Sequence, residues 1–170
     1  LGQSCLSFDF NQGEIDYNSI NVFKKDSIIL DYLNDFSERF HQLGDLKNSI
    51  DFKEIQCNII KEKIIYDTDN YFSELNKLGI LYSKNSEFSK ALKLKLETIN
   101  YYQQIGDTTG YNYGILLDNV GINYNDLGDH KKAYNFQLKA IKLIHKGLGK
   151  NHPSYVTSMN NLASTAISLM

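Results

Sequence analysis

The stretch from Asn119 to Ile141 reads NVGINYNDLGDHKKAYNFQLKAI, and it decides the fold. Its apolar and small residues recur at spacings of three and four, which is the period of a helix and not of a strand. The pair Leu127-Gly128 interrupts this pattern in the middle, and a glycine directly after a periodic run is a typical helix stop. The stretch therefore predicts two helices joined by a tight turn.

The same pattern returns along the chain, and Gly79 and Gly121 give its period of 42 residues. Three columns carry the repeat: a small column (Ser37, Gly79, Gly121, Ala163), an aromatic column three residues later (Phe40, Tyr82, Tyr124, then Ala166), and a second small column (Ser49, Ala91, Ala133). A small residue is needed wherever two helices of a hairpin cross closely. We therefore expect units at about 27–68, 69–110 and 111–152, followed by the first helix of a fourth unit at 153–170. The first helices are expected at 28–42, 70–84, 112–126 and 154–168.

Turn and cap residues mark the ends of these helices. Leu43-Gly44 repeats the glycine stop, while the second unit has Asn85-Ser86 in its place. Asn151, just before His152-Pro153, is a start signal for the last helix, since proline suits the first helical turn. The paired carboxylates Asp67 and Asp69 are expected to cap a helix start rather than to catalyse a reaction.

The pattern resembles the tetratricopeptide repeat, and its long period resembles the kinesin-light-chain type of that repeat. The likeness covers about residues 27–170, and it is carried by Asn119 to Tyr124, Leu127 to Asp129, Ala133, Ala140-Ile141, and the loop from Gly147 to Pro153 leading into Asn160 to Ala163. The resemblance implies an all-α, right-handed superhelical solenoid of antiparallel helix pairs, whose concave groove is lined by the first helices. One departure is that Lys53, Lys95 and Gln137 stand where the family often has an aromatic, which suggests a thinner or more exposed contact.

The resemblance also implies which residues face the groove. By the family's register these are Asn34, Asn76, Asp118 and Asn160, then Glu38, Ile80 and Ile122, and finally His41, Ser83 and Asn125. An amide in the first of these columns can both donate to and accept from the backbone of an extended ligand. The alternative, in which these polar groups bond to neighbouring first helices or to water, stays open at this point.

Composition narrows the classes of function. The formal net charge of the 170 residues is -2, so the basic field of a nucleic-acid-binding protein is missing, and no apolar run is long enough to suggest a membrane span. The four histidines form no metal-binding motif. Of the two cysteines, Cys57 is expected in the core and Cys5 in the N-terminal tail, so neither is expected to be a nucleophile. The lysines of the second helices, Lys95 among them, are expected mostly on a solvated convex face. We expect no enzyme activity, no cofactor and no metal.

The sequence thus predicts a module that binds a protein or peptide ligand, as part of a larger protein. The alternative is the sensory array of a multidomain signalling enzyme, with a caspase-like CHAT-type protease or a histidine kinase outside these residues. Residues 1–26 match no unit and are expected to form a tail or a lead-in helix. Both a cytoplasmic location and export after signal cleavage stay open. The last helix has no Asp, Glu, Lys or Arg between Asn151 and Met170, so we expect further repeats, another domain or self-association to cover it.

Overall fold

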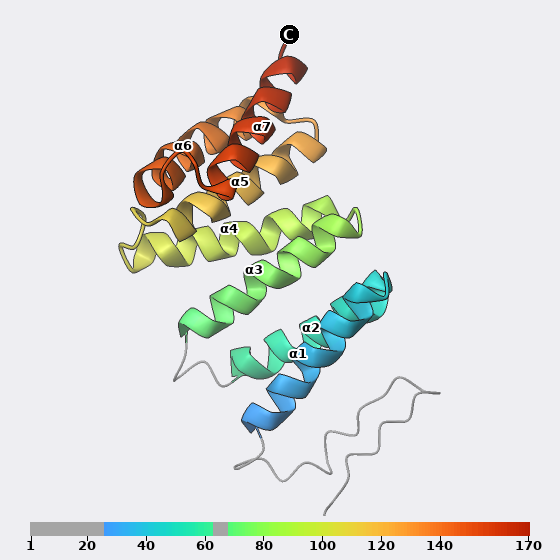
Figure 1. The fold of residues 1–170 in the computed structure, drawn as a ribbon. Helices are drawn as coiled ribbons and strands as arrows, with labels where there is room; N and C mark the ends of the chain where they lie inside the picture. Colours follow the sequence, from blue (N-terminus) through green and yellow to red (C-terminus); the bar gives the residue numbers. More distant parts are fainter. Residues whose placement is uncertain (1–25, 63–67) are drawn as a thin grey trace, which may run out of the picture.

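The computed structural model describes residues 26–62 and 68–170, and this part of the chain is helical apart from short turns and contains no strand (Figure 1). Its helices are α1 (Asp26–Gln42), α2 (Leu46–Glu62), α3 (Thr68–Lys84), α4 (Phe88–Gln104), α5 (Tyr111–Asp126), α6 (His130–Leu148) and α7 (Pro153–Ser168). The all-α prediction is confirmed. The first helices end at the predicted residues and begin one or two residues earlier than predicted. Cys5, Asp67 and the tail or lead-in helix expected at the N-terminus lie outside the described residues.

Helices that follow one another in the chain pack together, which makes the described part a stack of hairpins (Figure 1). In addition, α5 contacts both α3 and α7, whereas no contact within these residues joins α2, α4 and α6 to one another. The first helices α3, α5 and α7 therefore form a continuous layer. The core lies between the helices of each hairpin and its neighbours, with residues such as Leu75, Val120 and Ile144 fully or almost fully buried.

The turns inside the hairpins repeat with the same period as the columns. Gly44, Ser86 and Gly128 all have a positive φ, at 79°, 63° and 81°. In each turn the next residue donates its backbone N–H to the carbonyl five residues back, for example Asp129 to Tyr124 at 2.8 Å. Ser86 thus adopts the left-handed conformation that glycine adopts in the other two turns, at a cost of about 1 kcal/mol.

The start of α7 differs slightly from the expectation. Asn151 was predicted to mark it, but the cap is His152, whose Nδ1 accepts the backbone N–H of Ser154 at 3.1 Å. Pro153 is the first helical residue, as its missing N–H predicts. The imidazole nitrogen of His152 therefore caps the helix, a role that the sequence suggested for the side-chain oxygen of Asn151.

The small columns lie where the two helices of each hairpin approach closely. Ala91 and Ala133 are completely buried, and the Ser37 hydroxyl donates to the Ser49 carbonyl at 2.8 Å. At Gly121 an added Cβ would lie 2.6 Å from Cγ of Gln137, whereas at Gly79 it would lie 3.2 Å from Cγ of Lys95. The third hairpin therefore leaves less room than the second.

This difference predicts unequal effects of the same substitution. Gly121→Ala is expected to lower the free energy of unfolding by about 1–3 kcal/mol, because Gln137 must move. Gly79→Ala is expected to be close to neutral, since the higher helix propensity of alanine offsets a slight contact. Urea denaturation measures both, with Lys142→Leu at an exposed position as the control. Equal losses for the two glycines would contradict the packing described here.

Candidate functional site: the polar face of the first helices

The predicted groove residues lie on the first helices, in varied surroundings. In α1, the Nδ2 of Asn34 donates to Glu38 at 3.0 Å, and its Oδ1 accepts from the ammonium of Lys53 at 2.7 Å. In α3, Asn76 is half-buried and its Oδ1 is buried without a hydrogen-bond partner. In α7, Asn160 is exposed. Along this column, the side chain of Asn34 is hydrogen-bonded within the chain, whereas that of Asn160 is exposed to solvent.

Asp118, the third member of this column, joins two first helices. Its side chain is buried, and Oδ2 accepts from Ser158 at 2.9 Å and from Asn161 at 3.0 Å, both on α7. Burial raises the pKa of Asp118, and the two hydrogen bonds act against that rise. At this position the side chain bonds to the neighbouring first helix, which is the alternative that the sequence left open.

The remaining groove candidates are half-buried, except for the exposed Glu38. Ile80 and Ile122 form two apolar spots on α3 and α5. His41 lies 2.7 Å from the ammonium of Lys84, and Asn125 lies 2.8 Å from His130. The hydroxyl of Ser83 lies 2.9 Å from the carbonyl of Gly79 and also contacts Asn123 on α5.

A polar column on the second helices was placed wrongly from the sequence. Lys53, Lys95 and Gln137 were expected to form an exposed or thin contact, yet their exposed fractions are 3%, 2% and 1%. Lys95 is also an exception to the solvated face formed by the other lysines of α4 and α6. A lysine in this column can stay buried because its ammonium finds acceptors on the adjacent first helices.

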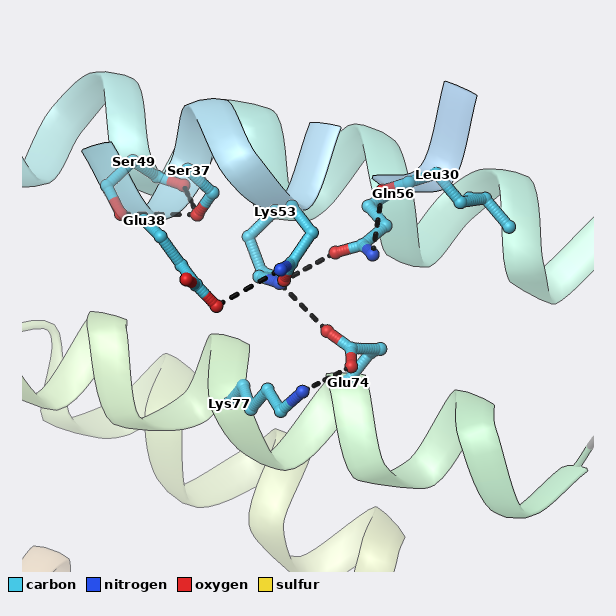
Figure 2. Close-up of polar contacts among 9 residues, drawn as sticks. Leu30, Ser37, Glu38, Ser49, Lys53, Gln56, Glu74 and Lys77 are labelled. Atoms are coloured by element: carbon cyan, nitrogen blue, oxygen red, sulfur yellow. Dashed lines mark hydrogen bonds and ion pairs between the residues drawn. The ribbon is translucent and has the colours of Figure 1, made fainter. Parts of the chain in front are cut away.

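The positive charge of Lys53 is balanced by a buried carboxylate of the same chain. Figure 2 shows the Lys53 ammonium next to Gln56 of its own helix and Glu74 on α3. Asn34 on α1 is a further acceptor of this ammonium. The Nζ lies 2.7 Å from Gln56 and 2.8 Å from the Glu74 carboxylate, which also pairs with Lys77 at 2.6 Å. Burial acts to raise the pKa of Glu74, but the bonds from the two lysines outweigh burial and bring the pKa below its usual value.

Lys95 has different partners. Its ammonium donates to Ser83 Oγ at 3.0 Å and to Oδ1 of Asn123, and the carbonyl of Asn119 lies 3.5 Å away. No carboxylate lies within ion-pair distance of it in the described residues. Burial therefore lowers the pKa of Lys95 to about 8, although the more distant charge of Asp126 acts to raise it.

The third member of the column, Gln137, keeps its Oε1 buried and unpartnered. Thr165 on α7 occupies the position that Asn123 holds one unit earlier, and its hydroxyl is also buried without a partner. Along this column, Lys53 has a carboxylate as its counterion, Lys95 has only neutral partners, and Gln137 is an uncharged amide.

The described residues show little sign of catalytic chemistry. Cys57 is buried as predicted, and burial, together with nearby Glu74, raises the pKa of its thiol to about 12. No group of three His, Cys, Asp or Glu side chains in residues 26–62 and 68–170 is arranged to hold a metal ion. Of the helices described, none combines the length and the apolar character needed to cross a membrane.

Comparison with solved structures identifies the fold. BtubC (BKLC) from P. vanneervenii superposes with a TM-score of 0.76 at 14% sequence identity, over 89% of this chain and 60% of that one. A putative kinesin light chain with nearly identical TPR-like repeats from Podosopora anserina, and a single-residue variant of it, give a TM-score of 0.77 at 16% identity, over 86% of this chain and 69% of theirs. This chain therefore spans about three fifths of the length of BtubC.

No profile of a known protein family and no curated protein matches the sequence. At such low identity the superpositions show the fold alone. They agree with the resemblance drawn from the 42-residue period and from the loop ending at Pro153. The protein folds as a TPR-like helical-repeat solenoid, an architecture typical of protein interaction scaffolds.

Proposed function

We propose that this chain is a protein interaction module that binds an extended peptide or a partner helix on the face formed by its first helices. The contact pattern is the main support for this choice of face. Among the described first helices, the backbone of α5 lies close to those of α3 and α7, while the backbones of α1 and α3 stay further apart, and no two of the described second helices come close to one another. The layer with the closer spacing lies on the inner side of a curved stack, and a concave inner face suits an extended ligand.

The chemistry of this face fits a peptide better than a small molecule. It offers two separate apolar spots, Ile80 and Ile122, between polar groups such as Asn125 and Asn160. Amide groups can bond to a ligand backbone whatever its side chains are, and the isoleucines can accept apolar side chains at intervals. Asp118 contributes mainly by joining α5 to α7, because its carboxylate is buried and already bonded.

The module is proposed to act inside a larger protein. The solved structures that it resembles continue beyond the part that superposes. The alternative of a sensory array joined to a CHAT-type protease or a histidine kinase uses the same binding face, and catalysis then lies outside these residues.

The test is selection of peptides from a displayed library of random dodecapeptides, followed by affinity measurement by isothermal titration. Ile80→Asp and Ile122→Asp are expected to lower the affinity for the selected peptides at least 10-fold, since a charge replaces an apolar contact. Lys93→Asp and Lys142→Asp, at exposed positions of the second helices, serve as matched controls. Peptides that bind all four variants with equal affinity would place the ligand elsewhere, and failure to select any peptide would contradict the proposal.

A further inference from the structure

We infer that Ser83 and the buried ammonium of Lys95 together form a recognition site for one carboxylate of the bound peptide. This inference rests on the proposed function, and it names the side-chain chemistry that the peptide should carry. It starts from the different neutralisation of two lysines in the same column.

The first unit provides an internal reference. Lys53 is buried beside Glu74, so its charge is balanced by a carboxylate of the same chain at 2.8 Å (Figure 2). The residue 42 positions after Glu74 is Leu116, a core residue that is 3% exposed. The acid that balances the first lysine is therefore replaced by an apolar side chain beside the second.

The ammonium of Lys95 also has different hydrogen-bond partners from that of Lys53. Lys53 bonds to Asn34 of its own hairpin, but the equivalent bond from Lys95 to Asn76 is not made, and the Oδ1 of Asn76 is left buried without a partner. Lys95 instead donates to Ser83 and Asn123. Its charge thus lies beneath a residue of the proposed binding face.

Ser83 connects the buried charge to the surface. Its hydroxyl oxygen accepts from Lys95 at 3.0 Å and from the Nδ2 of Asn123 at 3.0 Å, so its own hydrogen is left to donate to a third group. In the free chain that hydrogen goes to the backbone carbonyl of Gly79 at 2.9 Å, with Asn123 Oδ1 at 3.2 Å as a second acceptor, so a ligand acceptor has to take the place of these contacts. Ser83 is half-buried, and a ligand atom that bonds to its hydroxyl would lie one hydrogen bond away from the ammonium.

A carboxylate is the ligand group that this arrangement favours. A hydroxyl that accepts from a buried ammonium is a stronger donor than an ordinary serine, because the positive charge polarises it. The charge also acts over a short range through a medium that is poorer than water at screening it. Among the described residues, Asp126 is the acid that acts on Lys95, and it does so without forming an ion pair. A ligand carboxylate would supply the counterion that Glu74 supplies to Lys53.

The experiment compares peptides that differ in one charge. Dodecapeptides selected on the unmodified chain are expected to share one Asp or Glu, and replacing it by Asn or Gln should weaken binding about 10-fold or more in isothermal titration. On Lys95→Met the same replacement should change affinity less than twofold. Lys93→Met, an exposed lysine of the same helix, is the matched control and should keep the full preference.

A second variant keeps the lysine and supplies its counterion internally. Leu116→Glu places a carboxylate at the position of Glu74, so it should reduce the preference for the acidic peptide as Lys95→Met does. If Leu116→Glu does not fold, Ser83→Ala provides the second test, with the same expected loss. Selected peptides that bind without any acid preference, or that keep it on Lys95→Met, would overturn the inference and leave the binding face intact. Failure to select peptides at all would overturn both.

Discussion

The free energy of unfolding of this chain is expected to rise by about 3 kcal/mol, relative to its Lys95→Met variant, as the pH is raised from 7 to 10.5. The pKa of Lys95 is about 8 in the folded state, against the usual 10.5 in the unfolded chain. Between these values the unfolded state binds more protons than the folded one, so folding becomes more favourable as the pH rises. Below pH 8 both states are protonated and the full penalty for the buried charge remains. Asp126 is the charged group acting on Lys95 from α5, while Ser83 and Asn123 are neutral.

The measurement is urea denaturation of the two proteins at pH 7, 8, 9, 10 and 10.5. Tyrosines and other lysines titrate in the same range, but they are common to both proteins and cancel in the difference. Lys93→Met, whose side chain is exposed, should show no such difference from the unmodified chain. A constant difference between the chain and Lys95→Met across this range would mean that Lys95 is not perturbed by burial.

Breaking the ion pair between Lys53 and Glu74 from one side is expected to cost about 3–5 kcal/mol of unfolding free energy. Both side chains are less than a tenth exposed, so removing one leaves the other as a buried charge without its counterion. Lys53→Met should be the more severe single change, because it also removes the donor to Asn34 and Gln56. In Glu74→Leu, Lys53 keeps these two neutral acceptors.

The double variant Lys53→Met, Glu74→Leu tests the explanation. Because it removes both charges, it should be more stable than Lys53→Met alone, and the second unit shows that an apolar Leu116 is tolerated at the position of Glu74. A thermodynamic cycle of the four proteins, measured by urea denaturation, gives the coupling energy. Losses that simply add would contradict a direct pairing. Since the pKa of Glu74 lies below its usual 4.5, the stabilisation by this pair should be present at neutral pH and be lost as the pH falls below that value.

The periodic residues were enough to predict the fold. Gly79 and Gly121 define the repeat, and each marks a place where the two helices of a hairpin come close, more so at Gly121 than at Gly79. The ends of the first helices could be predicted because Gly44 and Gly128 favour a left-handed turn. Ser86 adopts the same conformation without being a glycine, and there the period, rather than the residue type, indicated the turn.

The burial of Lys53 and Lys95 could not be predicted in the same way. A lysine in a column that is often aromatic suggests exposure when it is considered by itself. Its burial depends on acceptors on other helices, such as Glu74 on α3 and Asn123 on α5, which belong to neighbouring units and to other columns. The lysine column and the acid column do not change together from unit to unit, because Lys95 keeps the lysine while Leu116 replaces Glu74, so the repeat by itself gave no signal for the pair.

The groove residues show the same limit. Asn34 and Asp118 share a column, but their partners are Lys53 on α2 in one case and Ser158 and Asn161 on α7 in the other. The register can place a residue on a helix face, whereas its bonding depends on the residues that the next helix presents. Whether these side chains contact a ligand stays a prediction for the experiments above.

The polar contacts also impose an order on the units, which a backbone repeat alone would not have. Glu74 balances the lysine of the preceding hairpin, and Leu116 cannot do the same. If the first two units exchanged places, Lys53 would be followed by Leu116 and would lose its acid, while Glu74 would lose the lysine before it. The hairpins therefore resemble one another in shape but are not interchangeable parts, and a shuffled array with the same composition should fold less well than the natural one.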